Sequence, residues 1–108
     1  MGYVAPEQDT FRAIADPKRR LMLDAMMGEE RTVGELTRLL GVSQATVSQH
    51  LQVLKLAGLV DGRRAGRNNF YRTRPSELAV VADWLEKYRS FWGARLDALE
   101  THLKQKRN

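Results

Sequence analysis

Hydrophobic residues recur every three or four positions along most of this chain, which is the spacing of amphipathic helices. The pattern predicts five helices, over residues 9–15, 17–27, 33–40, about 43–57 and about 76–103. Residues 59–64 and 69–74 instead predict two β-strands, and the Ala-Gly-Arg-Asn sequence at 65–68 favours a hairpin turn between them. The 108 residues therefore predict a single, mainly α domain with a small β-hairpin, in the order α-α-α-α-β-β-α.

Capping residues mark the ends of the second predicted helix. Asp16 and Pro17 begin it, because an aspartate side chain caps a helix and a proline needs no N–H at the first helical position. Gly28 is expected to end it. In the first two helices the residues expected to face the core are Phe11, Ile14, Leu21, Leu23, Ala25, Met26 and Met27.

The next two helices predict a helix-turn-helix. Thr32 and Glu35 match the capping box, in which each side chain accepts a hydrogen bond from the other residue's backbone N–H. That helix stops at Gly41, and Ser43 provides a new N-cap, so only residues 41–43 separate the pair. The residues expected to be buried are Val33, Leu36, Leu39, Leu40, Val47, Leu51 and Leu54.

The last predicted helix carries the longest apolar stripe of the chain. Pro75 ends the hairpin, and Ser76 is expected to cap this helix. At 1.5 Å per residue it would span roughly 40 Å, more than one small domain can cover, so a second copy of the chain is the expected partner. The stripe has nearly the 3.5-residue repeat of a packed helical seam and comprises Leu78, Val81, Leu85, Tyr88, Trp92, Leu96, Leu99 and Leu103. Tyr88, Phe91 and Trp92 fit core packing or the wall of a small apolar ligand pocket.

Composition narrows the class of protein. Hydrophobic residues make up 43% and charged residues 29% of the chain, an ordinary globular balance. No apolar stretch is long enough to cross a membrane and no secretory signal is visible, so we expect a cytoplasmic protein without a membrane partner. The chain has no cysteine, no evident nucleophile–base pair and no glycine-rich phosphate loop after a strand. We therefore expect neither an enzyme nor a bound cofactor.

Positive charge is concentrated in the middle third of the chain. The net charge is +5, and residues 43–75 contain six basic side chains but only one acidic side chain. Such a segment fits a polyanionic partner, because lysine and arginine that neutralise phosphates also release condensed counterions. A solvated charged surface is the alternative.

The polar face of the helix at 43–57 is suited to reading DNA. It carries short or amide side chains and no carboxylate; a glutamine amide can bond adenine, and an alanine can lie against a thymine methyl. An ordinary solvent-exposed face is the alternative, which the preceding helix and the basic hairpin disfavour. His50 fits either a packing role or a phosphate contact. The DNA-binding residues expected on this helix are Ser43, Gln44, Ala45, Thr46, Ser48, Gln49, His50 and Gln52.

The predicted hairpin at 59–74 carries arginines near its turn. Arg63, Arg64 and Arg67 lie close to Asn68, where they could reach a phosphate or the minor groove. Scattered arginines can also serve solubility alone. Placed directly after a helix-turn-helix, however, this basic hairpin predicts the wing of a winged helix-turn-helix.

Several motifs together resemble the ArsR family of winged-helix repressors. They are Asp16-Pro17 with Arg20, the run from Ser43 to Leu51, Leu54, Ala57-Gly58-Leu59-Val60 and Gly66-Arg67. The resemblance implies a homodimer that binds a palindromic DNA operator and is released by an inducer. It also implies that the first and last helices join the subunits, so the expected dimer interface comprises Phe11, Ile14, Leu78, Val81, Leu85, Tyr88, Trp92, Leu96 and Leu99.

The chain departs from the metal-sensing members of that family. The arsenic and cadmium sensors carry a cysteine pair on the helix before the recognition helix, but the matching residues 32–36 contain no thiol. Zinc sensors place histidines and carboxylates along the last helix, where this chain has only His102, with Asp97 and Glu100 nearby. We predict no metal site and an inducer that is not held by thiols. The alternative function is a winged-helix module that dimerises or docks on a protein without binding DNA.

Overall fold

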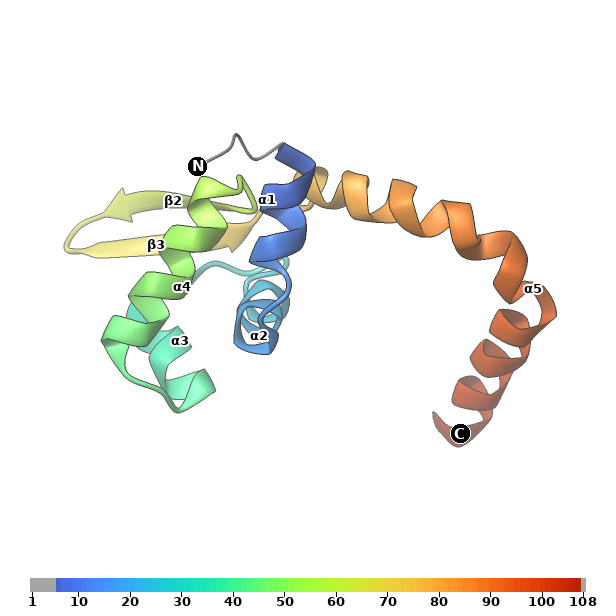
Figure 1. The fold of residues 1–108 in the computed structure, drawn as a ribbon. Helices are drawn as coiled ribbons and strands as arrows, with labels where there is room; N and C mark the ends of the chain where they lie inside the picture. Colours follow the sequence, from blue (N-terminus) through green and yellow to red (C-terminus); the bar gives the residue numbers. More distant parts are fainter. Residues whose placement is uncertain (1–5, 108) are drawn as a thin grey trace.

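A computed structural model describes residues 6–107 and, within them, the side chains of residues 9–93, 95 and 97–106. Helices and strands follow one another along the chain, and the three strands form one antiparallel sheet (Figure 1). The elements are α1 (Pro6–Ala13), α2 (Pro17–Ala25), β1 (Arg31–Thr32), α3 (Val33–Leu40), α4 (Gln44–Leu56), β2 (Val60–Ala65), β3 (Asn68–Thr73), the 3₁₀ helix η1 (Pro75–Leu78) and α5 (Ala79–Arg107). The mainly α fold with its β-hairpin is as predicted.

Local sequence explains where α2, α3 and α4 begin, but two predicted bounds were wrong: α1 covers residues 6–13 and not 9–15, and α2 ends at Ala25 with Met26 as its C-cap, before Gly28. The Asp16 carboxylate accepts the backbone N–H of Lys18 at 2.7 Å and caps α2. Thr32 and Glu35 form the reciprocal capping box of α3, which ends at Gly41 in the left-handed conformation with φ 68°. Ser43 caps α4 as predicted.

One hydrophobic core unites the helices and the root of the hairpin. Its buried residues are Ala13, Met22, Leu23, Met26, Leu36, Val47, Leu51, Leu54, Leu59 and Val60. Thr73 at the end of β3 is also buried, and its hydroxyl donates to the Leu23 carbonyl at 2.8 Å. This bond joins the hairpin to α2, on which the helix-turn-helix also packs.

Three residues predicted to be buried are instead exposed. Leu21 and Leu39 are each 58% exposed, and Met27 is 52% exposed. Met22, which the prediction omitted, is fully buried and points to the core with Leu23 and Met26, so Leu21 falls on the opposite side of α2. Met27 lies beyond the end of α2, and near the end of α3 it is Leu40, not Leu39, that packs against the core.

The sheet contains a strand that the sequence pattern did not predict. The strand order is β1-β3-β2, and β1 pairs Arg31 with Tyr71 and Thr32 with Phe70. The hairpin strands run over 60–65 and 68–73, so each strand is shifted by one residue from its predicted bounds at both ends. The strand β1 connects the root of the hairpin directly to the start of α3.

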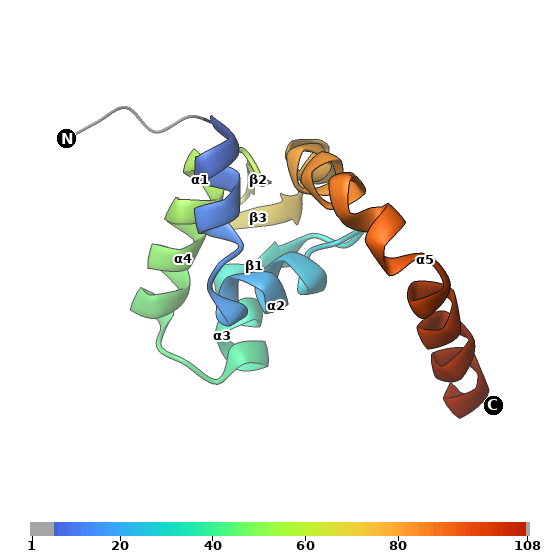
Figure 2. The same ribbon diagram turned by 45° about the vertical axis from the view of Figure 1, so that its right-hand side comes forward.

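The last helix differs from its prediction at both ends and in the middle. Ser76 does not cap it, because residues 75–78 form the 3₁₀ helix η1, whose N-cap residue Arg74 makes no side-chain cap bond. The helix α5 continues to Arg107 and is broken at Gly93, which has φ 33° and ψ −118°. Figures 1 and 2 both show α5 running away from the other elements and bending. The radius of gyration is accordingly 16.6 Å, against about 13 Å for a compact domain of this length.

Candidate nucleic-acid interface

The N-terminal turn of α4 is ordered by two of the predicted DNA-binding residues. The Ser43 hydroxyl accepts the Thr46 backbone N–H at 3.1 Å and lies 2.8 Å from the Thr46 hydroxyl. These two side chains therefore fix the start of the helix that presents the polar face. The other predicted residues of that face are all exposed: Gln44, Ala45, Ser48, Gln49 and Gln52.

His50 is held from the side of α2. Its Nδ1 lies 3.2 Å from the Arg19 guanidinium, which also donates to the Ala13 carbonyl at 2.6 Å and the Arg12 carbonyl at 3.0 Å. A guanidinium can only donate, so Nδ1 accepts and the proton of a neutral ring lies on Nε2. The packing role is thus present in the structure, and the half-buried ring keeps one nitrogen as a donor.

The wing leaves the body as a two-stranded ribbon. Its strands are paired from Val60–Thr73 to Ala65–Asn68, and Gly66 at the turn has φ 63°. Arg67 and Asn68 are exposed at the tip. Arg64 donates through Nε to the Gly66 carbonyl at 3.3 Å, which keeps its guanidinium beside the turn. The tip therefore presents two cations in a position to approach a phosphate backbone.

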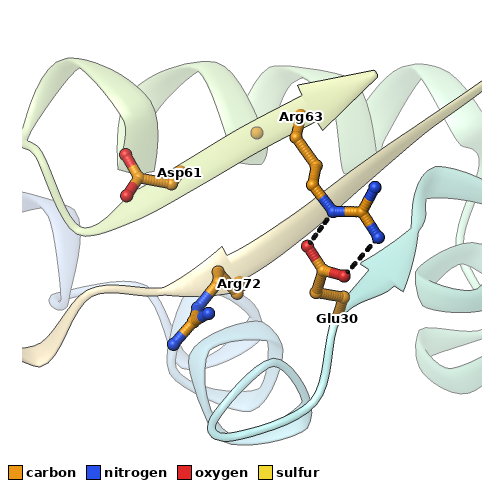
Figure 3. Close-up of a pocket in the computed structure, with 5 residues that line it drawn as sticks. Glu30, Asp61, Arg63 and Arg72 are labelled. Atoms are coloured by element: carbon orange, nitrogen blue, oxygen red, sulfur yellow. Dashed lines mark hydrogen bonds and ion pairs between the residues drawn. The ribbon is translucent and has the colours of Figure 1, made fainter. Parts of the chain in front are cut away.

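Arg63 is engaged differently from the other wing arginines. It donates to both carboxylate oxygens of Glu30, at 2.7 and 2.8 Å, and its guanidinium lies 5.1 Å from the Phe70 ring centre (Figure 3). Hydrogen bonding and charge from Arg63 lower the pKa of Glu30, and the same contact raises the pKa of Arg63. No local sequence pattern predicts this contact, because its partners are 33 residues apart.

A second contact joins the opposite face of the wing to α4. The Tyr71 ring lies over Gly62, where an added Cβ would come within 2.7 Å of the ring. The Lys55 ammonium of α4 lies 5.7 Å from the centre of the same ring. Glycine at position 62 is therefore what allows Tyr71 to bridge the wing and α4.

Comparison with known proteins identifies the family of this chain. The family described as bacterial regulatory protein, arsR family, matches residues 16–61. The HTH-type transcriptional regulator Rv2034 of Mycobacterium tuberculosis is 40% identical over 86 residues, which cover 80% of this chain and 79% of that protein. The chain belongs to the ArsR family. The prediction of a DNA-binding transcriptional regulator rather than an enzyme is thereby confirmed.

Two further relatives extend the match in sequence and in structure. The ArsR-family chain is 31% identical over 77 residues to the transcriptional repressor SdpR of Bacillus subtilis, covering 71% of this chain and 86% of that one. It superimposes on an ArsR-like transcriptional regulator from Rhodococcus sp. RHA1 with a TM-score of 0.72 and 28% identity, over 93% of this chain and 92% of that one. The winged-helix fold is thus confirmed over nearly the whole chain, including most of α5.

The terminal helices of this ArsR-family regulator share an aromatic surface. Phe11 on α1 meets Trp84 on α5 edge to face at 5.7 Å, Trp84 meets Tyr88 at 5.3 Å, and Tyr88 lies 6.5 Å from Phe91. Trp84 was missing from the predicted interface, although it stands four residues before Tyr88 and so shares its helix face.

The predicted dimer residues fall into two groups in the single chain. Leu78 and Ile14 pack against the core, and Val81 and Phe11 are also half-buried. The side chain of Leu96 lies outside the described residues. The remaining predicted residues are more than a third exposed: Leu85, Tyr88, Trp92 and Leu99. This apolar surface is uncovered in the monomer.

The described residues form neither a metal-binding cluster nor a membrane-spanning helix. They contain no group of three or more histidine, cysteine, aspartate or glutamate side chains placed to hold a metal ion. None of their helices is both long enough and apolar enough to span a membrane.

Proposed function

We propose that this ArsR-family regulator is a homodimeric repressor that reads a palindromic DNA operator with α4 and contacts the flanking phosphates with its wing. The observation that carries the proposal is the exposed, carboxylate-free face of α4, a helix that packs against strand β2 of the hairpin with the basic tip. A helix of this kind fits the major groove, where glutamine and serine can bond base edges. The relative SdpR, named as a transcriptional repressor, supports the direction of regulation.

The dimer is part of the same proposal. In α5 the uncovered residues Leu85, Tyr88 and Trp92 recur at helical spacing before the break at Gly93, as expected for a seam that packs against a second copy, and Leu99 is uncovered on the segment after the break. Two-fold symmetry would place two α4 helices about one DNA turn apart, roughly 34–36 Å. A cytoplasmic protein of this kind would release its operator when an inducer binds, and without cysteine that inducer is held by groups other than thiolates.

Selection of bound sequences from a random duplex pool tests the proposal. We expect a palindrome whose half-sites are centred about 10–11 base pairs apart. Parallel selection with the Gln49→Ala variant controls for sequences retained by charge alone. Enrichment of a single asymmetric site would contradict binding as a symmetric dimer. Recovery of unenriched DNA would favour a winged-helix module that does not read bases.

A further inference from the structure

We propose that the ion pair between Glu30 and Arg63 sets the direction in which the wing projects from the helix-turn-helix, with Arg63 as a positioning residue rather than a phosphate ligand. This inference rests on the proposed DNA-binding function and concerns the same surface. It changes the role expected for one of the three wing arginines, and it gives a role to Glu30, which the sequence analysis did not single out.

The ion pair ties together the two outer strands of the sheet. Arg63 on β2 is opposite Phe70 on the central strand β3, and Phe70 is opposite Thr32 on β1. The Arg63 guanidinium lies over the Phe70 ring. It makes two hydrogen bonds to Glu30, directly before β1 (Figure 3). Two parallel bonds fix the plane of a guanidinium as well as its distance. Arg63 therefore spans the sheet at the row where the third strand ends.

Beyond that row the wing has little else to direct it. The strand β1 has only two residues, and past Arg63 the pairs Arg64–Asn69 and Ala65–Asn68 form a ribbon of two strands. A ribbon of two strands is marginally stable by itself and twists readily. Going along the hairpin toward its turn, the contact with Glu30 is therefore the last one among the described residues that links this face of the wing to the rest of the domain.

Glu30 is well anchored to the helix-turn-helix. The next residue, Arg31, donates to the Ala25 carbonyl at 3.1 Å and lies 3.8 Å from the Glu35 carboxylate. Thr32 then caps α3. A tie to Glu30 is consequently a tie to the helix that supports α4.

Arg63 and Arg64 point to opposite faces of the ribbon because side chains alternate along a strand. Tyr71 shares a face with Gly62 and Arg64, and the Lys55 ammonium on α4 lies over the Tyr71 ring, so this face is on the side of α4. Arg63 is on the other face, where Glu30, Asp61 and Arg72 line the same open pocket (Figure 3). Arg64 is thus the wing residue on the face shared with the DNA-reading helix.

Whether one substitution raises or lowers the affinity for DNA distinguishes a positioning role of Arg63 from phosphate binding. If Glu30 merely competed with DNA for Arg63, Glu30→Gln would remove a repulsive charge, free a cation and tighten binding. If Glu30 directs the wing, Glu30→Gln weakens binding to operator and random duplexes alike, on the order of threefold to tenfold, the loss of about one wing phosphate contact per subunit. Glu29→Gln is the matched control: the Glu29 carboxylate pairs with Arg31 and not with Arg63, and the glutamine amide oxygen can still accept from Arg31, so this variant should bind at least as tightly as the wild type.

Two further variants make the outcome decisive. Glu30→Asp keeps the charge but shortens the reach, so it should also weaken binding, a result that charge alone would not give. Arg64→Gln should lower the slope of log affinity against log salt by about one per subunit. In the double variant Glu30→Gln/Arg63→Gln, binding should be no weaker than in Glu30→Gln alone. Thermal unfolding of each variant confirms that it is folded.

The inference is overturned if Glu30→Gln binds as tightly as the wild type or more tightly, or if Glu30→Asp leaves binding unchanged. Those results would leave the wild type a DNA-binding protein. Failure of the wild type to shift any duplex at low salt would instead contradict the proposed function, so the two failures are distinguishable.

Discussion

The Thr32–Glu35 capping box shows how single side chains stabilise this fold. The Thr32 backbone N–H donates to the Glu35 carboxylate at 2.9 Å, and the Glu35 N–H donates back to the Thr32 hydroxyl at 3.2 Å. The backbone bond from Thr32, followed by the Thr32 hydroxyl and the nearby Arg31 and Arg38, lowers the pKa of Glu35 from its ordinary value of 4.5. The ionised carboxylate is therefore favoured by folding.

Acid should remove this contribution. Because the pKa of Glu35 is lower in the folded state, its stabilisation is complete above the unfolded pKa and is lost as the pH falls through the folded pKa. Glu35→Gln keeps an acceptor but cannot titrate. In urea unfolding, the gap in unfolding free energy between wild type and variant should be constant well above the ordinary glutamate pKa of about 4.5 and shrink as the pH falls below it. A gap that stays constant as the pH falls would contradict this assignment.

Arg67 at the wing tip should contribute affinity rather than sequence choice. It is exposed beside the turn, so we expect a contact with phosphate or the minor groove. Arg67→Ala should weaken operator and random duplexes to similar extents and lower the salt slope by about one per lost contact in each subunit. Lys104→Ala near the end of α5 removes the same charge as a control. Loss confined to the operator would show that Arg67 reads bases.

The sequence predicted the role of some single residues but not the burial of others. The caps Asp16, Thr32 and Ser43 were predictable because each bonds to a backbone group two or three residues away. The burial of Met22 and the exposure of Leu21 were not, because in a run of three apolar residues the packing of α2 decides which two are buried.

Among the elements, α5 departs most from a regular geometry. Gly93 divides it into a first segment, which starts next to the other elements, and a second segment, which runs in a different direction (Figure 2). A side chain is strained at φ 33°, and alanine strongly favours a helix. Gly93→Ala should therefore straighten α5.

The distance between spin labels at Glu86→Cys and Lys104→Cys measures this change, because the chain has no cysteine of its own. In Gly93→Ala it should approach about 27 Å, the length of 18 residues of straight helix, and in the parent it should be shorter. Dilution with unlabelled chain removes distances between subunits. Equal distances in the two proteins would contradict a break at Gly93.

Sequence patterns predicted the long elements and missed the short ones. Helices with several turns show a clear period, whereas β1 has two residues and pairs with a strand almost 40 positions away. The apolar stripe continues on both sides of Gly93, so its spacing concealed the break. The Glu30–Arg63 contact depends on the unpredicted strand β1, so it could not be predicted from the sequence either.

On the scale of the whole molecule, the uncovered face of α5 predicts a dimer. Sedimentation equilibrium at micromolar concentration should give twice the 12.3 kDa chain mass. Leu85→Asp should dissociate or unfold the protein, because it places an unpaired charge in the seam at a cost of several kcal/mol. Ser90→Asp introduces the same group at an exposed position on the polar side of the helix and should leave the dimer intact. A helical wild-type monomer would contradict the predicted interface.

If two copies of α4 read DNA bases, replacing Gln49 should weaken binding to the operator but not to random DNA. The affinities of wild type, Gln49→Ala and the distant control Gln105→Ala should be compared on the selected operator and on random duplex across a salt series. We expect Gln49→Ala to cost about 1–3 kcal/mol per half-site on the operator, to change binding to random duplex hardly at all and to keep the salt slope. Equal losses on both DNAs would contradict base reading by α4.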